Sequence, residues 1–522
     1  MWTRTGLKKA ELEGGRKLFK HGGKQILVIE TEGRLFAIAN RCPHEGYPLS
    51  EGTLSQGCLL TCNWHNWKFD LTSGEALVGG DPVRTYPVRE AEGEILIDLA
   101  EPPADVVAER TFRGLAQAIA DEDATRMARE TARLAKAGFN AEDALRHAIH
   151  LSHDRFEFGT THAYAAAADW LALSRRAPDE ERGLTALLEP IAHIAEDIKG
   201  EHHHPFGDET ARWDATAFIG AVEAEDQKSA IALMSGGLGA GIAYEELRPA
   251  LAEAALAHYA DFGHSVIYVF KTGQLIGLLG KDVTAPLLKA LVRSLIYATR
   301  EERLPEFRGY ASALAAWDGK GNAPAQAENF IGQSVKGALK AVLASSGRPP
   351  REIYDALLEA AAWNQLHFDT KWERATDNAV ADNIGWLDFT HALTFANAAR
   401  HLCEETPELW PQALLQLALF VGRNRKYAYG NLDVSQWHVD DADEFISREM
   451  AALFDHSVPE PIIACHRIKN LFALEDELVS APQAPWRDTV LASVNRYLNT
   501  PLKRRHGLRQ ASQALDFIAQ ES

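Results

Sequence analysis

Residues 42–65, CPHEGYPLSEGTLSQGCLLTCNWH, contain the pattern that decides the fold of the N-terminal region. Cys42 and His44 form a Cys-x-His pair, Cys62 and His65 form a Cys-x-x-His pair, and seventeen residues separate the two pairs. Two thiolates and two imidazoles on short loops suit a [2Fe–2S] cluster with Cys on one iron and His on the other. A tetrahedral Cys2His2 zinc site is the alternative, although such sites usually run as a Cys pair followed by a His pair.

The surrounding residues are also specific. Residues 42–75, CPHEGYPLSEGTLSQGCLLTCNWHNWKFDLTSGE, resemble the Rieske ferredoxins and the Rieske domains of bacterial ring-hydroxylating oxygenases. This resemblance implies a one-electron relay, a Rieske [2Fe–2S] cluster held by Cys42, His44, Cys62 and His65. High-potential Rieske proteins carry one further Cys in each loop, and these pair in a disulfide. Tyr47 and Trp64 occupy the equivalent positions here, which favours the low-potential, ferredoxin-like type.

Composition limits the classes of partner. The chain has 522 residues, enough for two or more domains, and its net charge of −19 argues against binding to nucleic acid or to an anionic membrane surface. Five cysteines do not make a disulfide framework. We find no signal peptide and no apolar run long enough to span a membrane, so we expect a cytoplasmic protein. A homo-oligomer is compatible with these features.

The hydrophobic pattern changes near residue 102. Short apolar or alternating runs at 25–31, 35–39, 58–62, 67–70 and 94–99 predict β-strands separated by Gly and Pro turns. After Glu101-Pro102-Pro103 the apolar residues recur every three or four positions, which predicts helices, including 161–173, 247–279 and 386–402. We therefore predict a small all-β Rieske domain at 1–102 and a large all-α domain at 103–522. Ordinary Rieske oxygenases have an α+β second domain, and the all-helical pattern disfavours that assignment.

Four histidines of the helical region lie in strongly apolar surroundings: His162, His264, His391 and His466. Lys469 follows His466 by one helical turn, on the same face. A buried ionisable side chain is costly unless it is paired or binds a metal. These residues therefore suggest a second metal site. The alternative is that the histidines are core residues with ordinary hydrogen bonds and that the lysine extends from its helix to solvent. Reserve candidates are His147, His150 and His153 with Asp154, the segment 201–204 (EHHH), and Lys371.

The helical region also resembles the questin oxidase-like family of non-haem oxygenases. The similar segments are THAYAAAADWLALSRRA, GHSVIYVFKTG, FTHALTFAN and HRIKNLFAL. The resemblance implies one iron bound by His162, His264, His391, His466 and a Lys469 amine converted to a carbamate by CO2. Tyr268 stands where that family has a second His, and Asn470 replaces an apolar residue. Asp388 lies one turn before His391 and is the candidate for orienting a metal ligand. The predicted catalytic residues are therefore Lys469 and Asp388.

These features predict an oxygenase. Electrons from NAD(P)H would pass through a separate reductase to the Rieske cluster and then to a mononuclear iron, where O2 oxidises a small aromatic or quinone-like substrate. A separate reductase is implied because no GxGxxG motif joins a strand to a helix in this chain. The alternative is an electron-transfer or redox-sensing Rieske protein whose helical domain docks partners and holds no second metal.

Overall fold

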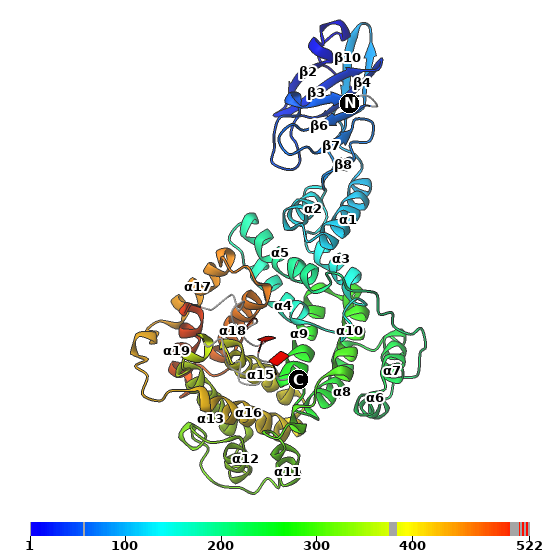
Figure 1. Cartoon of the computed structure of the whole chain (residues 1–522). Coiled ribbons are helices and arrows are strands. Elements are labelled where there is room, and N and C mark those ends of the chain that lie inside the picture. The colour runs from blue at the N-terminus through cyan, green and yellow to red at the C-terminus, as the bar shows by residue number, and fades with distance from the viewer. Residues whose placement is uncertain are drawn as a thin grey trace. The chain divides into compact units, whose positions relative to one another are not determined.

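The computed structural model describes residues 2–55, 58–374 and 384–501, together with 511, 514–515 and 518–519. The chain divides into two compact units, Met1–Ala144 and Leu145–Ser522. Strands occupy the first unit, and helices make up the second (Figure 1). The fold class predicted from the sequence, a small β domain followed by a large helical region, is confirmed.

The N-terminal unit contains three antiparallel sheets. Their strand orders are β1(Trp2–Arg4)-β10(Glu94–Asp98)-β9(Val88–Ala91), β2(Arg16–His21)-β3(Lys24–Thr31)-β4(Arg34–Ala39) and β5(Thr53–Ser55)-β6(Leu59–Thr61)-β7(Lys68–Asp70)-β8(Ala76–Val78). Strand β3 has a continuous apolar run because both of its faces are covered. Leu27 and Ile29 pack into the core beneath the two Cys/His loops, whereas Ile26 and Val28 pack into the opposite core.

Two helices, α1(Ala104–Ala120) and α2(Ala124–Lys136), belong to the same compact unit as the strands. Asp81 is fully buried, and α2 supplies its partners: Arg129 at 2.9 Å and the two guanidinium nitrogens of Arg133 at 3.0 and 3.1 Å. The change from strand to helix lies between Asp98 and Ala104, close to the predicted boundary after residue 102. That domain boundary stays a prediction, because the compact unit continues to Ala144.

The second unit consists of helices and their connections. The helices are α3(Asp143–Ser152), which begins at the division, α4(His162–Arg175), α5(Glu180–Asp197), α6(Ala215–Glu223), α7(Gln227–Gly239), α8(Tyr244–Leu256), α9(His264–Leu279), α10(Thr284–Tyr297), α11(Gly309–Ala315), α12(Val335–Ala344), α13(Pro350–Leu366), α14(Lys371–Arg374), α15(Trp386–Glu405), α16(Trp410–Asn424), α17(Ala442–Ala452), α18(Pro461–Ser480) and α19(Arg487–Asn499). Among the described residues, none of the helices is long and apolar enough to cross a lipid bilayer.

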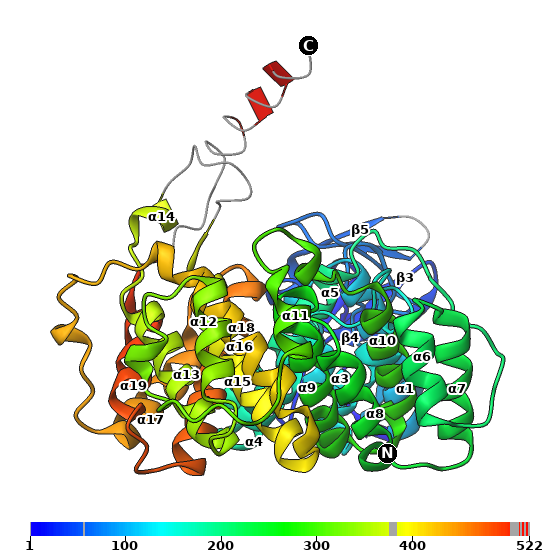
Figure 2. The same cartoon turned by 90° about the horizontal axis from the view of Figure 1, so that it is seen from below.

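Four of these helices form a closed square at the centre of the second unit (Figures 1 and 2). Helix α4 packs against α9 and α18, and α15 packs against the same two helices. The square brings together segments from four distant parts of the sequence, and each helix carries one of the four singled-out histidines.

One helix prediction was wrong. The segment 247–279 was predicted as a single helix, but it forms α8 and α9 with a break between them. Asp261, Phe262 and Gly263 have φ values of 51°, 48° and 84°, so three successive residues lie in the left-handed region. A right-handed helix cannot continue through such a turn, and α9 starts afresh at His264.

Candidate metal centres

The two Cys/His loops of the N-terminal unit have the same backbone hydrogen bonds. In each loop the Cys amide donates to the carbonyl five residues later, and the amide four residues later donates to the Cys carbonyl. These bonds are Cys42 to Tyr47 (2.8 Å), Gly46 to Cys42 (2.8 Å), Cys62 to Trp67 (2.7 Å) and Asn66 to Cys62 (3.0 Å). The fourth position after each Cys has positive φ and is Gly or Asn, the residues that tolerate it best.

This repeat places four donors together. The Nδ1 atoms of His44 and His65 face each other at 3.0 Å, on partly exposed and exposed rings. Cys42 and Cys62 lie buried beneath them, and burial raises the pKa of the Cys42 thiol to about 11. Two buried sulfurs and two outward imidazoles fit a [2Fe–2S] cluster with Cys on the inner iron and His on the outer iron.

Aromatic rings surround the two loops. Tyr47 and Trp64, at the positions where high-potential relatives have cysteines, lie 5.9 Å apart between ring centroids. The five cysteines of the chain are all free. Trp67 stacks on His44 at 4.9 Å, with an interplanar angle of 19°.

The second candidate centre is the histidine quartet, His162, His264, His391 and His466. Each residue comes from a different helix of the central square: α4, α9, α15 and α18. The Nε2 atoms form two pairs at 3.0 Å, His162 with His264 and His391 with His466. The nitrogens of His162, His264 and His391 lie within 4.8 Å of one another, a spacing that suits one metal ion.

Hydrogen bonds at Nδ1 fix the orientation of these rings. His264 contacts the carbonyl of Asp261 and His466 contacts that of Ile462 at 2.6 Å, and the ring of His391 is hydrogen-bonded to the backbone of Leu387. A carbonyl only accepts, so the Nδ1 atoms of His264 and His466 carry the proton, and the Nε2 atoms of these two rings present a lone pair when the rings are neutral. The Nδ1 of His162 lies 3.5 Å from the hydroxyl of Tyr268.

The donor set therefore fits a cation. In each pair at least one Nε2 has no proton while its ring is neutral: that of His264, 3.0 Å from His162, and that of His466, 3.0 Å from His391. Burial lowers the pKa of all four imidazoles, and a positive charge on Lys469 lowers each of them further. An unprotonated imidazole nitrogen is the form that binds a metal ion.

Lys469 lies against the quartet. It follows His466 by one turn of α18, is fully buried, and its Nζ has no hydrogen-bond partner among the described residues. Burial lowers the pKa of its amine. An amine without a partner in an apolar site is costly, and a neutral amine is the form that reacts with CO2.

The left-handed turn before α9 positions His264. A Cβ at Gly263 would lie 2.7 Å from Cδ2 of Phe395, so only glycine fits without movement. The amide of Phe262 donates to Oε2 of Glu301 at 3.1 Å. Glu301 is buried, and burial raises its pKa to about 8, so this carboxyl is largely protonated at neutral pH.

Asp388 has a capping role in the structure. One carboxylate oxygen accepts from the amide of Gly385 at 3.0 Å, and the other lies 3.2 Å from Arg423. The ring of His391 is hydrogen-bonded to the backbone of Leu387. A catalytic role for Asp388 stays a prediction.

The reserve candidates have other partners. His150 contacts Asp282 at 3.2 Å, His153 contacts the carbonyl of His150 at 2.9 Å, and His203 of the 201–204 segment contacts Asp154 at 3.0 Å. Lys371 pairs with Asp369 at 2.7 Å and is exposed. These interactions are typical of surface polar groups.

A cavity of about 630 Å³ opens beside the quartet. His162 and His264 line it, together with Tyr268, Asp197 and Arg155. Small-molecule sites commonly have volumes of about 300–1,000 Å³. The sequence did not single out Asp197, because only the packing of α5 beside α4 brings it to this cavity.

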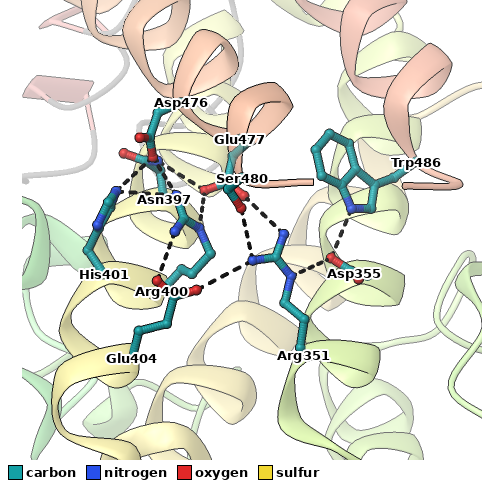
Figure 3. A network of polar contacts seen from close by, with 10 residues as sticks. All are labelled: Arg351, Asp355, Asn397, Arg400, His401, Glu404, Asp476, Glu477, Ser480 and Trp486. Atoms are coloured by element: carbon teal, nitrogen blue, oxygen red, sulfur yellow. Dashed lines mark hydrogen bonds and ion pairs between the residues drawn. The ribbon is translucent and has the colours of Figure 1, made fainter. Parts of the chain in front are cut away.

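A buried polar network holds α15 against α18 beyond the quartet (Figure 3). Glu477 is fully buried and accepts from Arg400 at 2.8 Å and from Asn397 at 2.9 Å. Asn397 also donates to Asp476 at 2.6 Å. Arg351 of α13 lies 3.8 Å from Glu477 and joins a third helix to the pair. This network fixes the register of the two helices that carry His391 and His466.

Comparison with known proteins identifies the N-terminal region. A model of the Rieske [2Fe-2S] domain family matches residues 3–87. The ferredoxin subunit of the 3-phenylpropionate/cinnamic acid dioxygenase of Escherichia coli (strain K12) is 35% identical over 94 residues, covering 18% of this chain and 89% of the relative. The ferredoxin component of the alkene monooxygenase system of Xanthobacter autotrophicus is 29% identical over 86 residues, covering 16% of this chain and 70% of the relative.

A solved structure also matches about a fifth of the chain. The ferredoxin of carbazole 1,9a-dioxygenase from Nocardioides aromaticivorans IC177 is 28% identical and has a TM-score of 0.18, covering 19% of this chain and 96% of the ferredoxin. The family match ends at residue 87, so the assignment of the helical unit to the questin oxidase-like family stays a prediction.

Proposed function

The chain belongs, through its N-terminal domain, to the Rieske [2Fe-2S] domain family, and we propose that it is an oxygenase with a second metal centre at the histidine quartet. The observation that carries this proposal is the quartet itself. Buried and half-buried imidazoles turn their Nε2 atoms toward one another in two pairs at 3.0 Å, beside a buried amine that has no hydrogen-bond partner among the described residues.

In this proposal Cys42, Cys62, His44 and His65 hold the Rieske cluster, a one-electron relay. A separate NAD(P)H-dependent reductase supplies the electrons. The exposed ring of His65 leaves the histidine side of the cluster accessible to such a partner. The ferredoxins similar to this domain belong to multicomponent oxygenase systems, as their names state, which supports the same assignment here.

The quartet, with Lys469 as a carbamate, would hold a mononuclear non-haem iron. Imidazole and an anionic oxygen suit iron, which supplies the activation of O2 for oxidation of an organic substrate. The protein residues have three tasks. Backbone hydrogen bonds hold three of the rings, burial lowers the pKa of the four imidazoles and of the Lys469 amine, and the cavity would admit a substrate beside His162 and His264.

The substrate proposed from the resemblance is an aromatic or quinone-like ring, which is hydroxylated or cleaved. The cavity is large enough for such a molecule and has an aromatic pair at its wall, Phe158 and Tyr297, 5.6 Å apart between ring centroids. Both rings are exposed, as expected for residues at the entrance of the cavity and not for residues of the packed core.

Metal analysis of matched variants tests the proposal. Replacing His391 by Ala should leave the visible Rieske spectrum intact and lower the iron content from about three to about two atoms per chain, because two belong to the cluster. His401→Ala is the control on the same helix, since His401 contacts Asp476 at 2.7 Å and lies outside the quartet. It should keep the full iron content.

The same experiment separates the two functions considered. Two irons per chain in the unaltered protein would refute the oxygenase and favour an electron-transfer protein with a docking domain. Anomalous scattering from crystals should show a metal peak between α4, α9, α15 and α18. A metal peak at residues 202–204 instead would show that the second metal site lies there and not at the quartet.

A further inference from the structure

Asp197 is one of the carboxylates that line the quartet cavity. It is the last residue of α5, and its side chain is 23% exposed. A negative charge at the C-terminus of a helix opposes the helix dipole. A hydroxyl and an imidazole lie next to its carboxylate: Thr161 at 2.6 Å and His193 at 3.7 Å.

Thr161 fixes Asp197 beside the quartet. The Thr161 hydroxyl caps α4 by accepting from the amide of Ala163, and it donates its own proton to Oδ2 of Asp197. The next residue in the chain is His162 of the quartet. This bond occupies Oδ2, and Oδ1 lies 3.7 Å from Nε2 of His193, beyond hydrogen-bond distance.

His193 supports Asp197 from the protein interior. It precedes Asp197 by one turn of α5 and is 4% exposed, and burial lowers its pKa to about 4. The ring is therefore neutral near pH 7 and provides no compensating positive charge. Burial raises the pKa of Asp197 to about 6. A carboxyl with this pKa can both accept and release a proton near neutral pH.

Several titratable groups face or neighbour Asp197. They are Glu196 and His193 on its own helix, Tyr164 on α4, Tyr268 on α9, Cys465 on α18, and Glu201 in the cavity wall. The phenols and the thiol stay neutral near pH 7 because burial raises their pKa. Glu181, in the first turn of α5, is exposed and is not among the residues that line the cavity, which suits it as a control for Asp197.

We propose that Asp197 is a catalytic residue that exchanges a proton with the occupant of the quartet cavity. In the step proposed, the O–H bond of an acidic hydroxyl group on the ligand breaks, its proton moves to the carboxylate of Asp197, and the ligand remains as the anion. No electrons are transferred. The anion then lies beside His162 and His264, where the proposed oxidation takes place. The reverse transfer returns the proton to the product.

This inference rests on the proposed function for the identity of the ligand, but its test needs neither reductase nor O2. The probe is a dihydroxyanthraquinone, whose visible band moves to longer wavelength when a ring hydroxyl ionises. Oxidised, iron-loaded protein is titrated with the probe about one pH unit below the pKa of the free probe. The wild type and Glu181→Gln should bind it as the anion, and Asp197→Asn should bind it with the neutral band. We expect the ionised fraction to fall at least about tenfold.

Asp197→Glu keeps the acid and should restore part of the ionised band, which a purely structural role would not predict. Asp197→Ser serves if the Asn variant does not fold. Identical bands in the wild type and Asp197→Asn would overturn the inference, as would a wild type that binds the probe neutral or not at all. Iron is measured in the same samples, so a missing quartet metal is recognised separately from a failed proton transfer.

Discussion

Replacing Lys469 by Met should have opposite effects on the stability of the metal-free and the iron-loaded protein. The amine is fully buried and has no hydrogen-bond partner among the described residues. Leaving a buried polar group unsatisfied costs about 1–3 kcal/mol. Methionine has a similar length and no such cost, so the free energy of unfolding of the metal-free helical unit should rise by about 1–3 kcal/mol.

The iron-loaded protein should respond in the other direction. A ligand that binds only the folded state stabilises it by about 4 kcal/mol at a thousandfold excess over its dissociation constant. If Lys469 holds the metal as a carbamate, its loss should lower the metal affinity about 10- to 100-fold or more, by analogy with the loss of groups that support ligands. The stabilisation by iron should then fall by at least about 1.4–2.8 kcal/mol.

The assay is urea unfolding followed by far-UV circular dichroism, which reports mainly on the helices, with and without iron. Lys271→Met is the matched control, because Lys271 is equally buried but pairs with Asp169 at 2.7 Å. Removing one member of a buried pair should destabilise the protein by about 3–5 kcal/mol. A metal-free Lys469→Met protein that is destabilised like Lys271→Met would refute the reasoning, because it would mean that the Lys469 amine is satisfied.

Two further substitutions test the segment that positions His264. Burial raises the pKa of Glu301 from 4.5 to about 8, so the folded protein prefers the protonated carboxyl. The free energy of unfolding therefore falls as the pH rises from about 4.5 to about 8, because the buried carboxyl must then ionise. Glu301→Gln should therefore be more stable than the wild type above pH 8, by about 3–5 kcal/mol, when urea unfolding is measured across this range; parallel pH profiles of the two proteins would contradict this. Gly263→Ala should destabilise the protein by about 2–4 kcal/mol and weaken iron retention, because the residue has φ 84° and the added Cβ would lie 2.7 Å from Phe395. Gly241→Ala, at the left-handed position that ends α7 (φ 79°) and with no atom within 4 Å of the added Cβ, isolates the conformational cost, and equal losses in both variants would exclude the steric contribution.

The N-terminal centre could be predicted because its information is local. Its four predicted ligands lie within residues 42–65, on two loops whose backbone hydrogen bonds span four or five positions. Short loops of this kind depend on nearby residues such as Gly46 and Asn66, which the sequence displays directly. The short apolar run of β3 and the three- to four-residue periodicity after residue 103 were likewise sufficient for the fold class.

Only the tertiary structure decided which histidines meet. His162 and His264 are 102 residues apart, and His391 and His466 are 75 apart, so their contact depends on the packing of α4, α9, α15 and α18. The apolar setting of each histidine predicted burial, but periodicity carries no information on which helices become neighbours. The burial of Lys469, the left-handed turn before His264 and the place of Asp197 in the cavity have the same origin. Each depends on atoms from segments far away in the chain, and these become neighbours only when the helices pack.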